Sequence, residues 1–302
     1  MRIAVTGSSG LIGTALVAAL QQDGHEVLRL VRRTPRTVDE HRWDPDHRRI
    51  DPSVLADVDA VVNLAGTPIR PRPWTKGYKE SLVRSRLDST ESVSRGLADA
   101  ATADPDRTRV LLSASAVGYY GDTGDEVVGE SHPAGTDFLA TLCARWEAAT
   151  APAEQAGVRV AHLRTGLVIG RGAMLMQILG LVFKLGLGGR LGSGRQFWPW
   201  ISLRDEVDAI RFLLTANVSG PVNLTGPAPV TNAGFTRKLG AAVSRPTFLT
   251  VPRFAISLGL GEFGRSSVLA GQKALPVRLQ EAGFRFSHTT LDDALQAALT
   301  RT

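Results

Sequence analysis

The segment RIAVTGSSGLIG, residues 2–13, constrains the fold more than any other stretch of this 302-residue chain. Its apolar start predicts a short strand, and the apolar side chains between Leu11 and Leu20 recur with helical spacing. Gly7, Gly10 and Gly13 lie between these two patterns in a GxxGxxG spacing. A glycine-rich turn that joins a strand to a helix is typical of a βαβ unit, whose helix packs back onto a parallel sheet.

Strand and helix patterns alternate through the first half of the chain. Apolar runs at 26–31, 59–66, 109–115 and 158–170 predict further strands, and helical patterns cover 78–101 and 138–156. Aromatic residues make up only 6% of the chain, which favours an α/β protein over an all-β one. We therefore predict an α/β fold with a doubly wound parallel sheet, a Rossmann fold, and a site at the carboxyl ends of its strands.

The alternation ends after Gly170, where glycine-rich loops and a Trp-Pro-Trp segment begin. Residues 220–226 still form a pattern typical of a late strand of the first sheet. We predict a nucleotide-binding domain made of 1–165 plus about 204–226, and a smaller, discontinuous C-terminal cap made of 166–203 plus 227–302. The apolar tract Met174–Leu187 is interrupted by polar residues, so we expect a buried helix there and no membrane span.

The glycine turn also predicts a ligand. Gly7 allows the tight turn, Gly10 lets the backbone approach a pyrophosphate, and Gly13 permits close packing of helix and strand. The helix N-terminus offers free N–H groups to the phosphates. We expect Ser9, Leu11 and Ile12 to contribute to this dinucleotide site; the alternative is a tight turn that binds nothing.

The end of the second strand distinguishes two dinucleotides. A carboxylate there would bind the ribose 2′-hydroxyl of NAD, but the chain carries Arg32 and Arg33 instead. Guanidinium groups suit a 2′-phosphate, which favours NADP(H), and we expect Arg33 to be the more solvated of the two. Other residues predicted to contact the cofactor come from later strand ends and the following helix: Leu64, Ala65, Gly66, Arg86, Ser113 and Gly166.

Several motifs in this order resemble the extended and atypical short-chain dehydrogenase/reductases: GSSGLIG, NLAG, SASAVGYYG, RTGLVIG and GPVNLTGP. More closely, stretches such as RLGSGRQFWPWISLRDEV and LQEAGFRF resemble a bacterial epimerase-like subfamily with a NAD-dependent epimerase/dehydratase domain and a C-terminal DUF1731-type domain. The resemblance covers essentially the whole chain. It implies a Rossmann domain, NADP(H) binding and epimerase-like or oxidoreductase chemistry on a small polar substrate, nucleotide sugars included.

The chain departs from this resemblance at the catalytic helix. Family enzymes use a tyrosine and a lysine in a YxxxK motif, together with a serine, to move the substrate proton. Ser115 matches the serine, but FLATLCARWE places Leu139 and Cys143 at the tyrosine and lysine positions. Neither residue can replace the original, because leucine has no proton to give and a thiol is not a fixed cation.

Three nearby residues are the replacement candidates. We expect Ser115 to orient a substrate oxygen, and either Tyr120 or Glu130 to handle the proton, with Arg164 as a neighbour that could adjust the tyrosine pKa. Each has a simpler alternative: a strand-end serine that caps backbone groups, an aromatic pair of Tyr119 and Tyr120, and a loop carboxylate that faces water.

The other polar residues give weaker evidence for a binding or catalytic site. Arg190 and Arg195 are candidate anion clamps, whereas His41 and His47 match no metal-ligand spacing and we predict no metal site. The net charge is +6 without a basic block, so we expect a small-molecule partner, no nucleic acid and no membrane.

The single cysteine and the absence of a signal pattern favour a location in the cytoplasm, and we expect a monomer or homodimer. The alternative function is a catalytically silent NADPH-binding redox sensor or partner-binding protein.

Overall fold

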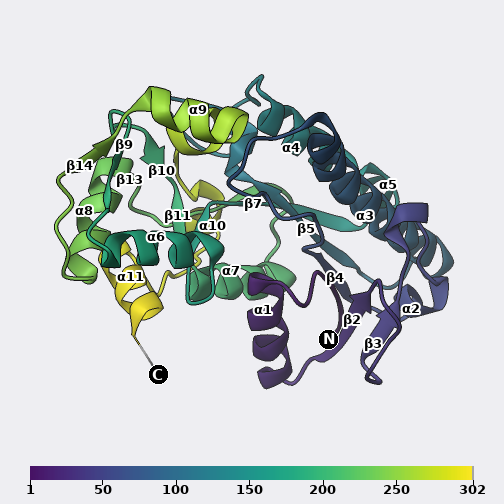
Figure 1. Cartoon of the computed structure of the whole chain (residues 1–302). Helices are drawn as coiled ribbons and strands as arrows, with labels where there is room; N and C mark the ends of the chain where they lie inside the picture. The colour runs from purple at the N-terminus through teal and green to yellow at the C-terminus, as the bar shows by residue number, and fades with distance from the viewer. Residues whose placement is uncertain (301–302) are drawn as a thin grey trace.

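A seven-stranded parallel sheet forms the centre of the computed structural model, which describes residues 1–300 (Figure 1). The strand order is β12-β7-β5-β4-β1-β2-β3, so the direction of winding reverses between β1 and β4. A crevice at the carboxyl ends of the strands is expected at such a reversal. The strands are β1 (Arg2–Thr6), β2 (Glu26–Val31), β3 (Glu40–Arg42), β4 (Ala60–Asn63), β5 (Val110–Ala116), β7 (Arg159–Thr165) and β12 (Gly220–Leu224).

Helices cover both faces of this sheet because alternate strand residues point to opposite sides. Ile3 and Val5 belong to a core shared with α1 (Leu11–Gln22) and α7 (Leu203–Thr215). Ala4 belongs to a second core on the other face. Four helices and a short 3-10 turn lie on that side: η1 (Pro45–His47), α2 (Pro52–Ala56), α3 (Lys76–Ala103), α4 (Phe138–Ala148) and α5 (Ala151–Gln155).

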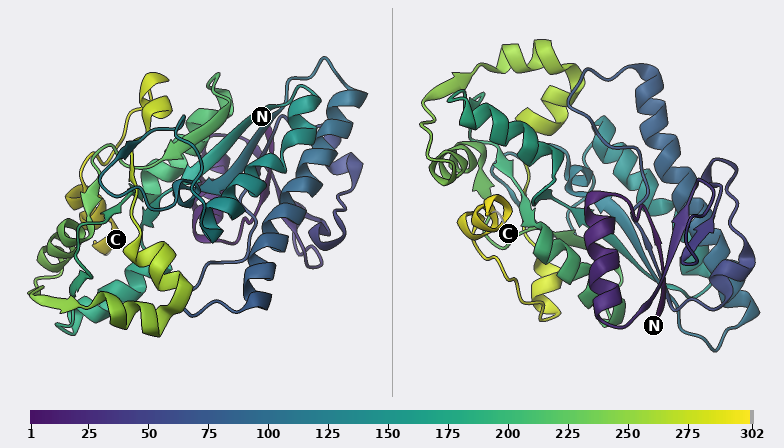
Figure 2. Two further views of the ribbon diagram at one scale, coloured as in Figure 1. Left: turned by 90° about the horizontal axis from the view of Figure 1, so that it is seen from above. Right: turned by 60° about the horizontal axis from the view of Figure 1, so that its bottom comes forward.

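A smaller region lies beside the carboxyl ends of β5 and β7 (Figure 2). Trp198, Trp200, Phe235 and Leu295 form its buried core. Two-stranded ladders join its segments, including one that links β6 back to β15. Its elements, with η2 and β6 of the connecting loop, are η2 (Val117–Tyr120), β6 (Val127–Val128), β8 (Leu167–Ile169), α6 (Met174–Lys184), β9 (Gly189–Leu191), β10 (Phe197–Trp198), β11 (Trp200–Ser202), β13 (Val230–Thr231), α8 (Asn232–Ala242), β14 (Leu249–Val251), α9 (Arg253–Phe263), η3 (Gly264–Leu269), β15 (Lys273–Ala274), α10 (Val277–Glu281) and α11 (Leu291–Leu299).

The doubly wound α/β prediction is confirmed, including the late strand β12. The expected helix 138–156 is split into α4 and α5. The segment 158–170, expected to hold a strand and its exit, contains β7 and then the short strand β8. The three-residue strand β3 carries too little pattern to be predicted. The domain division stays a prediction, and Leu279 and Phe284 of the expected cap pack into the main core beside α7.

The prediction of a buried helix over Met174–Leu187 is wrong. Helix α6 buries only Met176, Gly180 and Phe183, while Leu181 is 62% exposed. An apolar composition indicates that a helix can be buried, but the elements packed around the helix decide what fraction of its surface is buried. Within residues 1–300, no helix combines the length and apolarity that a membrane crossing needs.

Candidate functional site

The glycine turn after β1 forms a tight backbone cradle. Gly7 has φ +64, and a Cβ added there would lie 2.6 Å from the carbonyl oxygen of Leu64. A Cβ on Gly13 would overlap the carbonyl oxygen of Gly7. Gly10 caps α1 without any side-chain hydrogen bond, and no acidic residue lies in the first turn. The positive end of α1 therefore stays open to an anion, as a pyrophosphate site requires.

The loop after β4 is fixed above this cradle by a buried threonine. Thr6 Oγ1 accepts hydrogen bonds from the backbone N–H groups of Leu64 (3.0 Å) and Ala65 (3.1 Å), and donates to Asn63 Oδ1 (2.7 Å). Gly66 follows directly and approaches the Arg86 side chain, where an added Cβ would lie 3.4 Å from Arg86 Cγ. The predicted cofactor residues of the two loops are thus brought together at the reversal of the sheet.

The two arginines after β2 differ in what they contact. Arg33 donates to both carboxylate oxygens of Glu40, at 2.7 Å and 2.6 Å, and this pairing holds the pKa of Glu40 at about 2. Arg32 is exposed and pairs with no carboxylate in the part of the chain that the structure describes. Arg33 is therefore held by an internal partner instead of being simply solvated, and Arg32 is the guanidinium left available for a ligand.

A cavity of about 700 Å³ lies where β5 and β7 end and the smaller region begins. Gly118 and Gly166 line its wall on the side of the sheet. Leu139 and Cys143 line it one helical turn apart, so the positions matched to the family tyrosine and lysine do face the cavity. Burial raises the pKa of the Cys143 thiol to about 12, with Glu147 acting in the same direction.

Among the described residues that line this cavity, Arg86 supplies the single charged side chain. It is 7% exposed, donates to the carbonyl oxygens of Thr67 and Leu82 at 3.1 Å each, and lies 4.9 Å from the Trp146 ring centre. Burial lowers its pKa, and no carboxylate pairs with it among residues 1–300. A buried cation without a counter-ion is costly, which favours an anionic ligand beside it.

Ser115 belongs to a buried ionic network next to the cavity. Its hydroxyl donates to Glu147 Oε1 at 2.7 Å, and Arg164 donates to both oxygens of Glu147 at 2.8 Å each. Strand register places Ser115, Arg164 and Asn223 side by side on β5, β7 and β12. Glu147, on α4, closes the network from the adjoining helix.

Tyr120 completes this network from the side. The prediction that Arg164 neighbours it is confirmed, because Arg164 Nη1 donates to the Tyr120 hydroxyl at 3.0 Å. That hydroxyl donates to Asn223 Oδ1 at 2.7 Å, and burial raises the Tyr120 pKa despite the nearby guanidinium. The ring also packs edge-on against Tyr119, at 5.5 Å between ring centres.

Glu130 is buried and does not face water. Its Oε1 accepts from the backbone N–H groups of Asn223 (3.1 Å) and Arg278 (3.2 Å), which ties the loop to β12 and α10. None of Ser115, Tyr120 and Glu130 lines the cavity. Ser113 lies two residues before Ser115 on β5. It is buried, and its Oγ has no hydrogen-bond partner among the described residues.

Sequence reasoning did not identify Glu206. This residue of α7 is fully buried, accepts a hydrogen bond from Thr165 Oγ1 at 2.8 Å, and burial raises its pKa to about 8. Thr165 in turn lines the cavity. Only the tertiary packing of α7 against β7 produces this environment. The sequence shows Glu206 as an ordinary acidic residue of a helix and does not indicate that it is buried.

The raised pKa of Glu206 predicts a pH-dependent stability. An acid whose folded pKa lies above its ordinary value of 4.5 destabilises the fold increasingly as pH rises from there to about 8. In that window, the free energy of unfolding of Glu206→Gln should rise relative to that of the parent by about 1.4 kcal/mol per pH unit. Thermal unfolding of both proteins across this range measures the difference, and parallel curves would contradict the assignment.

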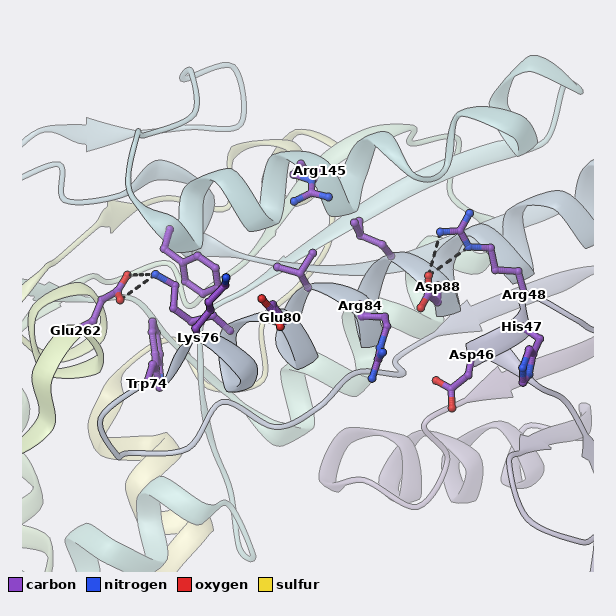
Figure 3. A pocket seen from close by; sticks show the side chains of 14 residues that line it. Asp46, His47, Arg48, Trp74, Lys76, Glu80, Arg84, Asp88, Arg145 and Glu262 are labelled. Carbon is purple, nitrogen blue, oxygen red and sulfur yellow. Dashed lines mark hydrogen bonds and ion pairs between the residues drawn. The ribbon is translucent and has the colours of Figure 1, made fainter.

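A second, charged groove lies on the outer faces of α3 and α4 (Figure 3). Its volume is about 990 Å³, and two ion pairs lie within its lining: Arg48 with Asp88 (3.1 Å) and Lys79 with Glu262 (2.8 Å). None of the predicted site residues lines it, and it lies away from the glycine cradle. The cavity at the strand ends is therefore the candidate active site.

The remaining polar predictions lie outside that cavity. Arg190 and Arg195 do not line it; Arg195 is exposed and lies 3.5 Å from Asp125. His47 is exposed beside Asp44. Across residues 1–300, the structure contains no cluster of three or more His, Cys, Asp or Glu side chains suited to a metal ion.

Comparisons with known proteins agree with this architecture. A model of the NAD dependent epimerase/dehydratase family matches residues 3–225, and a domain of unknown function, DUF1731, matches residues 251–298. An epimerase family protein of Mycobacterium tuberculosis is 51% identical over 300 residues, covering 99% of this chain and 98% of that protein.

Two solved structures are also similar. The human epimerase family protein SDR39U1, crystallised with NADPH, has a TM-score of 0.85 and 33% identity over 99% of both chains. The nucleoside-diphosphate sugar epimerase from Corynebacterium glutamicum has a TM-score of 0.79 and 35% identity, over 99% of this chain and 58% of that one.

Proposed function

Since this chain belongs to the NAD-dependent epimerase/dehydratase family, we propose that it binds NADP(H) and uses it for hydride transfer in the cavity at the ends of β5 and β7. The observation that carries this proposal is the open glycine cradle at the N-terminus of α1, which no side chain of residues 1–300 caps by a hydrogen bond. Arg32 supports the phosphorylated dinucleotide, because it takes the place of a ribose-binding carboxylate. The human relative crystallised with NADPH is consistent with that choice.

The bound cofactor would supply a hydride to a substrate carbonyl carbon, and the carbonyl oxygen then needs one proton. This chain provides no tyrosine or lysine on the described cavity lining. Burial raises the pKa of the Cys143 thiol and so makes it a poor proton donor. The described lining also carries the hydroxyl groups of Thr165, Ser266 and Ser267. The apolar walls exclude water, and Arg86 would hold an anionic part of the bound molecule.

The predicted catalytic roles of Ser115, Tyr120 and Glu130 stay predictions. Their contacts support a positioning role instead, since the Ser115 and Tyr120 hydroxyls and Glu130 Oε1 are engaged by Glu147, Arg164, Asn223 or the backbone. The second candidate function is an NADPH-binding protein that does not turn over, favoured by the missing tyrosine and lysine. A screen of carbonyl compounds that follows NADPH oxidation separates the two functions.

The cofactor site is tested by Gly13→Ala. The added methyl group would overlap the Gly7 carbonyl, so the cradle must distort and NADPH affinity should fall by about tenfold or more. Nicotinamide fluorescence titration measures this loss. Gly77→Ala, in a helix with open space around the added methyl group, is the matched control and should bind NADPH like the parent. Equal affinity of all three proteins would contradict the proposed cofactor site.

A further inference from the structure

The cavity lining is far more apolar than a sugar-nucleotide site requires. In the lining formed by residues 1–300, Arg86 carries the single charge, and the remaining polar side chains are few: Thr165, Ser266, Ser267 and Gln272, besides the Cys143 thiol. Everything else is aliphatic, aromatic, glycine or proline. Most of the apolar side chains come from four elements, α4, α6, β10 and α9, among them Leu142, Ile178, Phe197 and Leu260.

The few polar groups are already in use on the side of the sheet. Arg86 approaches Gly66 of the cofactor loop, Thr165 donates to Glu206, and Gln272 donates to the Gly121 carbonyl oxygen. On the side of the smaller region, Ser267 Oγ is buried and has no partner among the described residues. A nucleoside diphosphate needs several donors for its two phosphates, and this side of the cavity offers hydroxyl groups but no cation.

The apolar lining continues out to the surface. Met174 and Ile178 line the cavity and are also 41% and 42% exposed, so they lie at its rim. Beyond them, Leu181 of α6 and Leu185 at its C-cap are exposed, and so are Phe254 and Leu258 of α9, another helix of the lining. Exposed apolar side chains gathered beside an apolar cavity mark a route for a ligand that itself avoids water.

We infer that the substrate of this site is a long-chain aliphatic carbonyl compound, whose chain lies against α6 and α9 and whose carbonyl group lies near Gly118 and Cys143. The inference rests on the proposed function, because it names the substrate class of the same cavity. A volume of about 700 Å³ lies within the usual range for pockets that enclose one small molecule. In reduction, the hydride of NADPH adds to the carbonyl carbon and a proton to its oxygen, giving an alcohol and NADP⁺.

The first experiment measures binding of N-phenyl-1-naphthylamine, an uncharged apolar fluorophore, in the presence of NADPH. Its emission should rise saturably, and long-chain aliphatic aldehydes should displace it, whereas UDP-glucose should not. For turnover of unbranched aldehydes, kcat/KM should rise by about fourfold for each added CH₂ until the cavity is full. Displacement by UDP-glucose, or turnover that does not change with chain length, would overturn the inference.

Two substitutions on α6 test where the probe binds. Ile178→Arg puts a charge at the cavity rim and should weaken probe binding by about tenfold or more, because an apolar ligand would then desolvate a guanidinium. Gln177→Arg adds the same charge at the neighbouring, exposed position outside the lining, and should bind the probe like the parent. Met174→Arg is a second rim variant in case the first folds poorly, which thermal unfolding reports.

The outcomes separate this inference from the proposed function. If the parent does not bind NADPH, the proposed function itself fails. If NADPH binds but the probe does not, only the substrate class is overturned. Equal losses in Ile178→Arg and Gln177→Arg would show that the probe sits on the outer face of α6, which also overturns the inference.

Discussion

Replacing Arg164 with methionine is expected to destabilise this protein by about 3–5 kcal/mol. Arg164 is 2% exposed and forms two hydrogen bonds with Glu147, so its removal leaves a carboxylate with little access to water and no counter-ion. Burial opposes the charge on Arg164, but its bonds to Glu147 raise its pKa above the ordinary value. Chemical denaturation measures the free energy of unfolding directly.

Two comparisons make the Arg164 result specific. The double variant Arg164→Met, Glu147→Gln removes both charges and should recover part of the lost stability, because the remaining cost was the unpaired carboxylate. Arg204→Met breaks a pair with Asp208 whose arginine is exposed, and should cost less than about 1 kcal/mol. If Arg164→Met costs no more than Arg204→Met, the network does not stabilise the fold as described.

Arg32→Ala is expected to lower the affinity for NADPH by about 10–100-fold, the value of a charge-assisted hydrogen bond to a phosphate. The affinity for NADH should change little, because NADH has no 2′-phosphate for the guanidinium to bind. Arg32 is exposed and without a carboxylate partner in the described chain, so its loss should not disturb the fold. Parallel titrations with the two dinucleotides measure the change in preference.

Arg33→Ala is the matched comparison for Arg32. Arg33 is already paired with Glu40, so it contributes less to a ligand, and its removal should lower NADPH affinity by a smaller factor. A larger loss in Arg33→Ala than in Arg32→Ala would reassign the 2′-phosphate to Arg33. Equal affinity of the parent for NADPH and NADH would contradict the proposed contact between an arginine and the 2′-phosphate.

Local sequence determined the main sheet and the cofactor loop. The strand, glycine turn and helix of residues 2–22 are adjacent in the chain, and the steric demands on Gly7 and Gly13 depend on contacts within that unit and with the next strand end. The same holds for Leu139 and Cys143, because a spacing of four residues on a helix places both on one face. Such patterns can be predicted because neighbouring residues create them.

Only the tertiary structure decided what surrounds those residues. Ser115, Glu147, Arg164 and Asn223 meet because β5, β7 and β12 lie in register beside α4, although the chain separates the first and last by more than a hundred positions. Burial by α7 likewise gives Glu206 its raised pKa, and open solvent beside α6 leaves its apolar side exposed. Burial and ion pairing depend on neighbours far away in the chain, and the local pattern of a helix or strand is the same whichever neighbours it meets.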